Sequence, residues 1–293
     1  MEQCDLDIVR RAFAKQIMAA AGADHASVEA GFATVRREEF LGPGPWRILR
    51  WGRGYVPTSS DDPVYLLTDD VVVILPDKHI NNGQPSLHAW LMASANPRAG
   101  EHVVHIGAGV GYYTAILAHA VGPGGRVTAI EFDPGLAERA QANLSAVPQV
   151  RVVQGDGSLA SFDPADVIYV NAGATRPADR WLDGLRDGGR LILPLTTDQG
   201  FVAGSSISTA QLSIDRRGAV FLIERRGGDY LAKWLSPVAI FPCEGMRDPD
   251  SEAALAAAFE KGGWRDVTRL YRSQDVAEGD CWLRAPGWSL ANR

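Results

Sequence analysis

Hydrophobic residues recur along the chain in patterns that predict alternating strands and helices. Apolar side chains at three- and four-residue spacing predict an amphipathic helix over residues 8–21. Short apolar, β-branched runs predict buried strands at 71–75, 103–106, 127–130, 150–153, 167–170 and 190–193, with helices at 114–120 and 135–144. Strands that alternate with helices in this way are typical of a parallel sheet covered on both faces.

The segments on either side of this central pattern differ from it. Residues 41–62 are rich in Gly, Pro, Ser and Trp, which favours a loop-rich segment. Apolar runs at 210–214 and 219–223 predict a hairpin, and a last helix is expected over 251–260, before two glycines. We therefore expect three parts: an N-terminal helical and loop-rich region (1–97), an α/β domain (98–245) and a C-terminal extension (246–293).

Composition excludes several classes of protein. The 293 residues carry 29 Lys and Arg against 35 Asp and Glu, a net charge of −6, which argues against a surface built to neutralise phosphates. No apolar run approaches the ~20 residues of a membrane helix, and no signal-peptide pattern opens the chain, so a cytoplasmic protein is expected. The widely spaced Cys4, Cys243 and Cys281 predict neither a disulfide scaffold nor a metal site.

A glycine-rich turn follows the strand predicted at 103–106. Gly107, Gly109 and Gly111 stand between this strand and the next helix, where glycines let the backbone approach a ligand and the helix presents free N–H groups. A dinucleotide fingerprint would need a small residue at position 112, which is occupied by Tyr112. The spacing therefore favours S-adenosylmethionine over NAD.

Two acids follow the next two strands. Glu131 ends one strand 20 residues after Gly111, where a carboxylate can accept hydrogen bonds from both ribose hydroxyls. Asp156 follows the next strand, where the adenine would lie. Singly, the glycine turn is also explained as a tight connection, Glu131 as a solvated acid at a helix start and Asp156 as a turn residue. Their order at successive strand ends favours a cofactor site.

The chain resembles a known family in several motifs. They are Val-Val-His-Ile-Gly-Ala-Gly-Val-Gly-Tyr at 103–112, Gly-Asp-Gly-Ser-Leu at 155–159 and Asp-Gly-Gly-Arg-Leu-Ile-Leu-Pro at 187–194. These motifs are similar to those of class I S-adenosylmethionine-dependent methyltransferases, and specifically to the protein-L-isoaspartate O-methyltransferase family. Segments 33–40 and 84–89 extend the resemblance, which spans about residues 8–245.

The resemblance implies a fold, a cofactor and a set of site residues. The fold is a doubly wound, mostly parallel, seven-stranded Rossmann-like sheet with the N-terminal region on the substrate side, and the cofactor is S-adenosylmethionine. The cofactor-binding residues expected are Gly107, Ala108, Gly109, Gly111, Glu131, Phe132, Asp156, Gly157 and His88. His88 also fits a helical pattern, so a buried structural histidine explains it equally well.

One segment departs from the family pattern. Members carry T-I-S-[QA]-P, whose Ser faces the reacting carboxylate, whereas residues 81–85 read Asn-Asn-Gly-Gln-Pro, so Gly83 replaces that Ser. Asn81, Asn82 and Gln84 are candidates to position an acceptor carboxylate or amide. A plain turn before the proline explains them equally well.

These observations lead to one main functional prediction and two alternatives. An acceptor carboxylate is ionised at neutral pH and needs no general base, so carboxyl O-methylation of a protein or peptide is favoured. The alternatives are a small-molecule O-methyltransferase and a cofactor-binding protein without isoaspartyl activity, because of Gly83. Nucleic acid and membrane partners are not expected. The Trp- and Arg-rich segment 46–53 suits either recognition of an acidic or planar substrate or a partly exposed lid.

Overall fold

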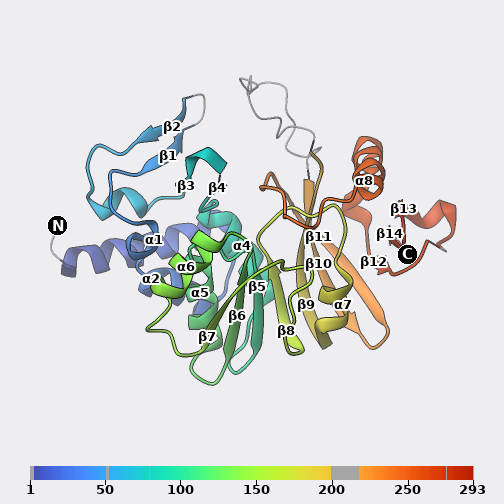
Figure 1. The fold of residues 1–293 in the computed structure, drawn as a ribbon, viewed down its shortest axis with the longest axis horizontal. Coiled ribbons are helices and arrows are strands. Elements are labelled where there is room, and N and C mark those ends of the chain that lie inside the picture. Colours follow the sequence, from blue (N-terminus) through green and yellow to red (C-terminus); the bar gives the residue numbers. More distant parts are fainter. Residues whose placement is uncertain (1–2, 51–52, 79, 199–217, 275, 293) are drawn as a thin grey trace. The chain divides into compact units, whose positions relative to one another are not determined.

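The structure is a computed structural model that describes residues 3–50, 53–78, 80–198, 218–274 and 276–292. Figure 1 shows the helices and strands along the chain. The chain divides into two compact units. The first comprises Met1–Val103 and Ala108–Gln154, and the second comprises Val104–Gly107 and Gly155–Arg293. Each unit is described by itself.

Helices make up the N-terminal part of the first unit. They are α1 (Gln3–Ala21), α2 (Ala26–Thr34), α3 (Arg37–Leu41) and α4 (Pro85–Ala95). Helix α1 contains the predicted helix and begins five residues before it. It contacts α2 and α4, while α2 lies against α5 (Tyr112–Val121). Gly31 permits that close approach, because a Cβ there would lie 2.9 Å from Cγ2 of Ile116.

The segment predicted as loop-rich contains a β-hairpin, so that prediction was incomplete. Strands β1 (Arg47–Arg50) and β2 (Gly54–Pro57) pair antiparallel, with Ile48 opposite Val56. The apolar residues of these short strands favour strand formation despite the Gly and Pro residues around them, and Ile48 is buried. The remaining short elements are η1 (Pro63–Leu66), β3 (Val73–Leu75), η2 (Pro76–Lys78) and β4 (Ile80–Asn81).

The α/β part of the first unit follows the predicted alternation. Its elements are β5 (His102–Ile106), whose last three residues fall in the second unit, then α5, β6 (Arg126–Glu131), α6 (Pro134–Asn143) and β7 (Val150–Gln154). Strands β6 and β7 pair in parallel, from Val127 opposite Val150 to Glu131 opposite Gln154. Helices α5 and α6 contact both strands. This register brings the carboxyl ends of β6 and β7 level with each other.

The second unit continues with parallel and then antiparallel pairing. Strand β8 (Ala165–Val170) is followed by α7 (Asp179–Gly184), β9 (Leu185–Thr196), β10 (Gly218–Arg226) and β11 (Asp229–Pro237). Strand β9 is parallel to β8 and antiparallel to β10, which in turn pairs antiparallel with β11. Of the predicted hairpin, residues 219–223 lie in β10, whereas 210–214 fall outside the described residues.

The C-terminal region adds strands to the edge of this sheet. It comprises α8 (Pro249–Lys261), η4 (Trp264–Asp266), β12 (Arg269–Tyr271), η5 (Glu278–Asp280), β13 (Cys281–Ala285) and β14 (Trp288–Ala291). Strand β12 pairs with β11 and β14, and β13 pairs with β14. The described sheet therefore has ten strands, in the order β13-β14-β12-β11-β10-β9-β8-β5-β6-β7, rather than the seven expected. The predicted α/β fold class is confirmed, while the boundaries near 97 and 245 stay predictions.

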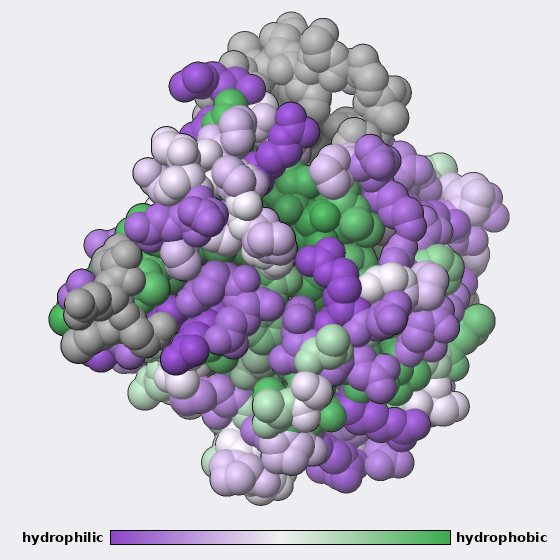
Figure 2. Space-filling model, turned by 60° about the vertical axis from the view of Figure 1, so that its left-hand side comes forward, coloured by the Kyte–Doolittle hydropathy of each residue, from purple (hydrophilic) through white to green (hydrophobic). Residues whose placement is uncertain are grey.

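Few large apolar side chains are exposed in the described part of the chain. On the face shown in Figure 2, hydrophilic residues cover most of the surface, and hydrophobic residues emerge in smaller areas. The exposed large hydrophobic residues are Ile8, Phe132 and Leu159. Among the described helices, none has both the length and the apolar character to cross a membrane. Phe132 and Leu159 each lie within three residues of a predicted cofactor-binding acid, which makes their exposure relevant to the site.

Candidate cofactor site

The glycine-rich turn has the backbone geometry that the sequence predicts. Gly109 and Gly111 have φ values of +57° and +93°, a region that residues with a side chain rarely adopt. Gly111 directly precedes α5, and a Cβ there would lie 2.7 Å from Cδ1 of Leu144. A Cβ on Gly109 would meet no atom within 4 Å, so open space lies in front of this residue. The turn is thus tight on the helix side and open at Gly109.

Glu131 is held against this turn by main-chain hydrogen bonds. Its Oε2 accepts from the N–H of Gly109 at 2.7 Å, and its Oε1 accepts from the N–H of Asp133 at 3.0 Å. The residue is 7% exposed, and burial raises its pKa, although these two N–H groups oppose the shift. A main-chain hydrogen bond from Phe132 also favours the charged carboxylate. Glu131 is therefore oriented and can bind a pair of hydroxyls.

Tyr112, which distinguishes the turn from a dinucleotide fingerprint, is buried in an aromatic cluster. Its ring lies 5.7 Å from that of Phe40 and 6.4 Å from that of Phe32, both edge-to-face. The Arg37 guanidinium lies 5.8 Å from the same ring centroid. Burial raises the pKa of the Tyr112 hydroxyl. The large side chain at 112 thus serves the helical core of the first unit and leaves the space at Gly109 open.

His88 occupies the space that a side chain at position 83 would need. It is 2% exposed on α4, and its ring stacks on Tyr113 with centroids 3.7 Å apart. A Cβ on Gly83 would lie 2.3 Å from Nε2 of His88, and Gly83 has a φ of +71°. The Gly83 backbone and the His88 ring therefore fit together only because residue 83 has no side chain.

The amides near Gly83 take part in hydrogen bonds within the first unit. Asn81 donates to the Tyr55 hydroxyl at 3.2 Å, and its Oδ1 accepts from the Gly83 N–H at 2.8 Å. Gln84 donates to Oδ2 of Asp69 at 2.9 Å and is exposed. These bonds support the turn interpretation of the segment. A role for Asn81, Asn82 and Gln84 in positioning substrate stays a prediction.

Arg37 is a buried charged residue that is hydrogen-bonded to Asn82, next to Gly83, and the sequence analysis did not single it out. It is fully buried, and its Nε donates to Oδ1 of Asn82 at 3.0 Å. Its other nitrogens donate to the main-chain oxygens of Leu66, Thr68 and Asp70. A buried guanidinium with this many acceptors fixes the geometry of residues 66–70 and 82. In the sequence, Arg37 stands in the charged run Arg-Arg-Glu-Glu-Phe. Such a run is equally typical of an exposed surface, so it does not indicate that Arg37 is buried.

In the second unit, Gly107 and Gly157 pack against main chain and core. A Cβ on Gly107 would lie 3.1 Å from the main-chain oxygen of Asn171, and one on Gly157 would lie 2.4 Å from Cγ2 of Ile106. The Gly157 oxygen accepts from Nε1 of the buried Trp181 at 2.8 Å. The contacts of Gly157 fix the backbone directly after Asp156.

Asp156 itself is partly exposed, and Ser158 orients its carboxylate. Its Oδ1 accepts from the Ser158 N–H at 2.8 Å and from the Ser158 hydroxyl at 2.6 Å. Its Oδ2 faces Gly245, where a Cβ would lie 2.3 Å away. Asp156 and Gly157 are thus both in the second unit. Gly245 lies beside Asp156, a contact that the sequence does not predict.

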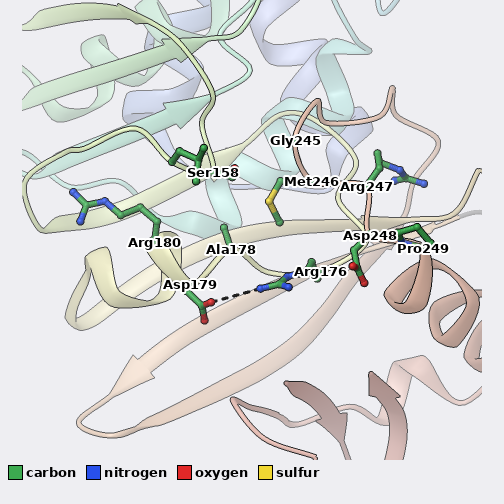
Figure 3. Close-up of a pocket in the computed structure, with 11 residues that line it drawn as sticks. Ser158, Arg176, Ala178, Asp179, Arg180, Gly245, Met246, Arg247, Asp248 and Pro249 are labelled. Carbon is green, nitrogen blue, oxygen red and sulfur yellow. Dashed lines mark hydrogen bonds and ion pairs between the residues drawn. The ribbon is translucent and has the colours of Figure 1, made fainter. Parts of the chain in front are cut away.

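A cleft of about 550 Å³ lies in the second unit close to these residues (Figure 3). Ser158 and Leu159 line it, together with residues from the start of α7 and the segment Gly245–Pro249. Figure 3 shows Met246 between Ser158 on one side and Arg176 on the other. Arg176 pairs with Asp179 at 3.5 Å across the edge of the cleft. The wall of the cleft therefore includes residues that the sequence analysis assigned to an extension of unknown role.

The Trp- and Arg-rich segment 46–53 is described only in part, because residues 51–52 fall outside the described residues. Trp46 is buried and donates from Nε1 to the Gly42 oxygen at 2.9 Å. Arg50 pairs with Asp70, while Arg47 and Arg53 are exposed. The Trp46 ring is therefore a core residue, and the two exposed arginines remain compatible with both predicted roles.

The fold matches solved methyltransferase structures. A solved protein-L-isoaspartate O-methyltransferase superposes with a TM-score of 0.63 at 20% identity, over 97% of this chain and 88% of that one. A putative protein-L-isoaspartate O-methyltransferase from Plasmodium falciparum, in complex with S-adenosyl-L-homocysteine, superposes with a TM-score of 0.58 at 15% identity, over 80% and 98%. Together with the glycine-rich turn, this likeness defines the fold as that of a Rossmann-like class I methyltransferase.

The chain belongs to the protein-L-isoaspartate(D-aspartate) O-methyltransferase family, whose model matches residues 54–224, more than half of its length. The protein-L-isoaspartate O-methyltransferase of Thermotoga maritima is 29% identical over 209 residues, which is 69% of this chain. That of Ignicoccus hospitalis is 34% identical over 163 residues, covering 54% of this chain and 69% of the relative. The match spans only 56% of the Thermotoga maritima protein. The resemblance found in the sequence is confirmed at the level of the family.

Proposed function

We propose that the protein is an S-adenosylmethionine-dependent methyltransferase that methylates a carboxylate of a protein or peptide. Membership of the protein-L-isoaspartate(D-aspartate) O-methyltransferase family supports this reaction class. The single observation that carries the proposal is the oriented carboxylate of Glu131 beside the open glycine-rich turn. Its relative from Plasmodium falciparum, solved with S-adenosyl-L-homocysteine, supports the choice of cofactor.

The residues of the first unit fit the adenosine part of such a cofactor. Main-chain N–H groups hold the Glu131 carboxylate in a fixed orientation, and a carboxylate can accept hydrogen bonds from the hydroxyls of a ribose. Phe132 directly follows it and is 49% exposed, so its ring is available to a planar base. The open space at Gly109 admits a ligand against bare backbone. We assign ribose binding to Glu131 and contact with the base to Phe132.

The reaction demands alignment rather than acid–base chemistry from the protein. The cofactor supplies a methyl group on a positively charged sulfur, which is already activated for displacement. An acceptor carboxylate with a pKa of about 4 is ionised at neutral pH. One of its oxygens forms the new O–CH₃ bond as the S–CH₃ bond breaks, so no proton is transferred and the sulfur becomes neutral. The chain's own residues therefore need only orient the two reactants and exclude water.

Gly83 supports a second candidate function, a protein that binds the cofactor without isoaspartyl activity. The His88 ring lies where a side chain at position 83 would start, so the segment offers no hydroxyl at that point. Methylation of a small molecule is the third possibility. Under the main proposal, the N-terminal region carries the acceptor, and residues 81–84 lie beside it.

Transfer of a labelled methyl group separates these functions. The protein is incubated with S-adenosylmethionine labelled on the methyl group and with a peptide that contains isoaspartate, and a matched aspartate peptide is the control. We expect base-labile label on the isoaspartyl peptide alone, as a methyl ester requires. Label only in a metabolite extract would favour a small-molecule acceptor. Binding of the cofactor without label on any acceptor would favour the binding protein and reject the main proposal.

A further inference from the structure

A tight turn in the C-terminal part of the chain lies directly against Asp156. In this turn, formed by residues 243–246, the Met246 N–H donates to the Cys243 oxygen at 3.1 Å. Gly245 is its third residue and has a φ of +78°, which type II turns require at this position. The turn lies beyond residue 224, where the match to the family model ends.

Hydrogen bonds connect this turn to the loop that follows β8. The N–H of Gly173 donates to the Phe241 oxygen at 2.7 Å, and the N–H of Cys243 donates to the Gly173 oxygen at 2.8 Å. On the other side of the turn, the Thr175 N–H donates to the Met246 oxygen at 3.0 Å. The turn is therefore fixed at both ends to a single short loop, residues 173–175.

Arg247 adds a third connection. Its Nη1 donates to the main-chain oxygens of Gly173 and Thr196, each at 3.0 Å. Its Nη2 pairs with Glu252 at 2.6 Å, and the Arg247 side chain is only 20% exposed. A partly buried, charge-assisted network of this kind holds its members in one arrangement. The position of Gly245 is thus set by the fold and not by the turn alone.

The same position determines what can approach Oδ2 of Asp156. The other oxygen, Oδ1, already accepts two hydrogen bonds from Ser158. A Cβ on Gly245 would lie 2.3 Å from Oδ2 and 2.9 Å from Cγ of Asp156. A side chain at position 245 and a hydrogen-bond donor to Oδ2 therefore compete for the same space. Only glycine avoids this clash while the turn stays in place.

We propose that Gly245 is a positioning residue for Asp156 and that, through it, the turn 243–246 contributes to recognition of adenine. In this arrangement Ser158 holds Oδ1, and Gly245 leaves Oδ2 free to accept from the 6-amino group of adenine. This inference rests on the proposed function, because it requires the adenine of the cofactor to lie beside Asp156. It gives residues 243–246, which lie beyond the range of the family model, a role in recognising the base.

Two alanine variants with equal backbone strain test this role. Gly245→Ala and Gly287→Ala both place a side chain at a positive φ, +78° and +77°, but a Cβ at 287 meets no atom within 4 Å. Binding to the full-length protein is measured by titration calorimetry with S-adenosylhomocysteine and with its analogue that carries hydrogen in place of the 6-amino group. Thermal unfolding of each variant measures the loss of stability separately.

We expect the unchanged protein to bind S-adenosylhomocysteine about tenfold more tightly than the analogue, as one hydrogen bond to a charged group allows. Gly245→Ala should lose that preference, and Gly287→Ala should keep it. Equal weakening of both ligands, or an unchanged preference, in Gly245→Ala would overturn the inference. Absence of binding by the unchanged protein would instead reject the proposed function.

Ser158→Ala provides a second route if Gly245→Ala does not fold. This change removes the hydroxyl that holds Oδ1 but leaves the turn intact. The carboxylate should then rotate more freely, and the preference for the 6-amino group should fall by about threefold, in line with one lost hydrogen bond. An undiminished preference in Ser158→Ala would contradict the proposed orientation of Asp156.

Discussion

Glu131 ends strand β6 and Asp156 follows the neighbouring strand β7, yet the protein orients their carboxylates in different ways. Glu131 is 7% exposed, and main-chain N–H groups of Gly109 and Asp133 hold it. Asp156 is more exposed; Ser158 holds one of its oxygens, and Gly245, 89 residues later, lies against the other. The first acid is thus fixed by the local chain and the glycine-rich motif, whereas the second depends on a contact that only the fold creates.

Neutralising Glu131 should have the largest effect on cofactor binding. Glu131→Gln should weaken binding of S-adenosylhomocysteine about 100-fold, or ~2.7 kcal/mol, because two hydrogen bonds to a charged acceptor lose strength. Titration calorimetry measures the change. Glu138→Gln, at an exposed position on α6, is the matched control and should bind like the unchanged protein. A loss below fivefold for Glu131→Gln would remove this residue from the ribose site.

Asp156→Asn should have a smaller effect, about tenfold on the same affinity. The change affects a single hydrogen bond to the base, and the amide oxygen of Asn can still accept this bond, although more weakly than a carboxylate. The same titration, run beside that of Glu131→Gln, gives the ratio between the two acids. Should Asp156→Asn cost as much as Glu131→Gln, the assignment of ribose to one acid and base to the other would be wrong.

A buried histidine of the second unit, His105, leads to an expected response to acid. Burial lowers the pKa of His105, in the second unit, to about 3, whereas an unfolded histidine titrates near 6.5. Below pH 6.5 the unfolded state binds a proton that the folded state does not, so the free energy of unfolding falls as pH falls. From pH 7.5 to 5.5 this group should remove about 1.4 kcal/mol.

Urea unfolding at both pH values measures that loss. His105→Gln should reduce the difference between pH 7.5 and 5.5 by about 1.4 kcal/mol relative to the unchanged protein. His119 of the first unit is exposed, so His119→Gln should leave the difference as it is. The same pH dependence in His105→Gln as in the unchanged protein would show that His105 is not buried in its neutral form.

The smallest expected effect concerns Gly83. Gly83→Ala should lower the free energy of unfolding by about 1 kcal/mol more than Gly122→Ala does. Both glycines have positive φ, +71° and +66°, but only at 83 would the new Cβ collide with His88, while that at 122 meets open space. Chemical denaturation of the two variants measures the difference. Equal losses would show that the His88 ring moves aside at little cost.

Much of the structure around Glu131 was predictable from the sequence. Apolar runs predicted β5, β6 and β7, and the spacing of Gly107, Gly109 and Gly111 marked the turn between a strand and a helix. All of these signals act over a few residues, which is the range in which hydrophobic periodicity and turn chemistry operate. The fold class followed from these signals and the family from the resemblance of the motifs, and the comparisons confirm both.

The rest depends on contacts between residues far apart in sequence. Strands β12, β13 and β14 are short, and their apolar residues do not reveal that they extend the sheet to ten strands. The hairpin of β1 and β2 was hidden by the surrounding Gly and Pro. Arg37 reads as a surface charge, because its acceptors at 66–70 and 82 are brought to it by the fold. Gly245 likewise gives no local sign that Asp156 lies beside it.

Binding of S-adenosylhomocysteine to the unchanged protein, followed by titration calorimetry at pH 7.5, tests the central claim most directly. We predict one site per chain, with a dissociation constant in the micromolar range, about −8 kcal/mol. The same titration with NADH should give no heat of binding, because Tyr112 replaces the small residue of a dinucleotide turn. No heat with S-adenosylhomocysteine at millimolar concentration would contradict the account.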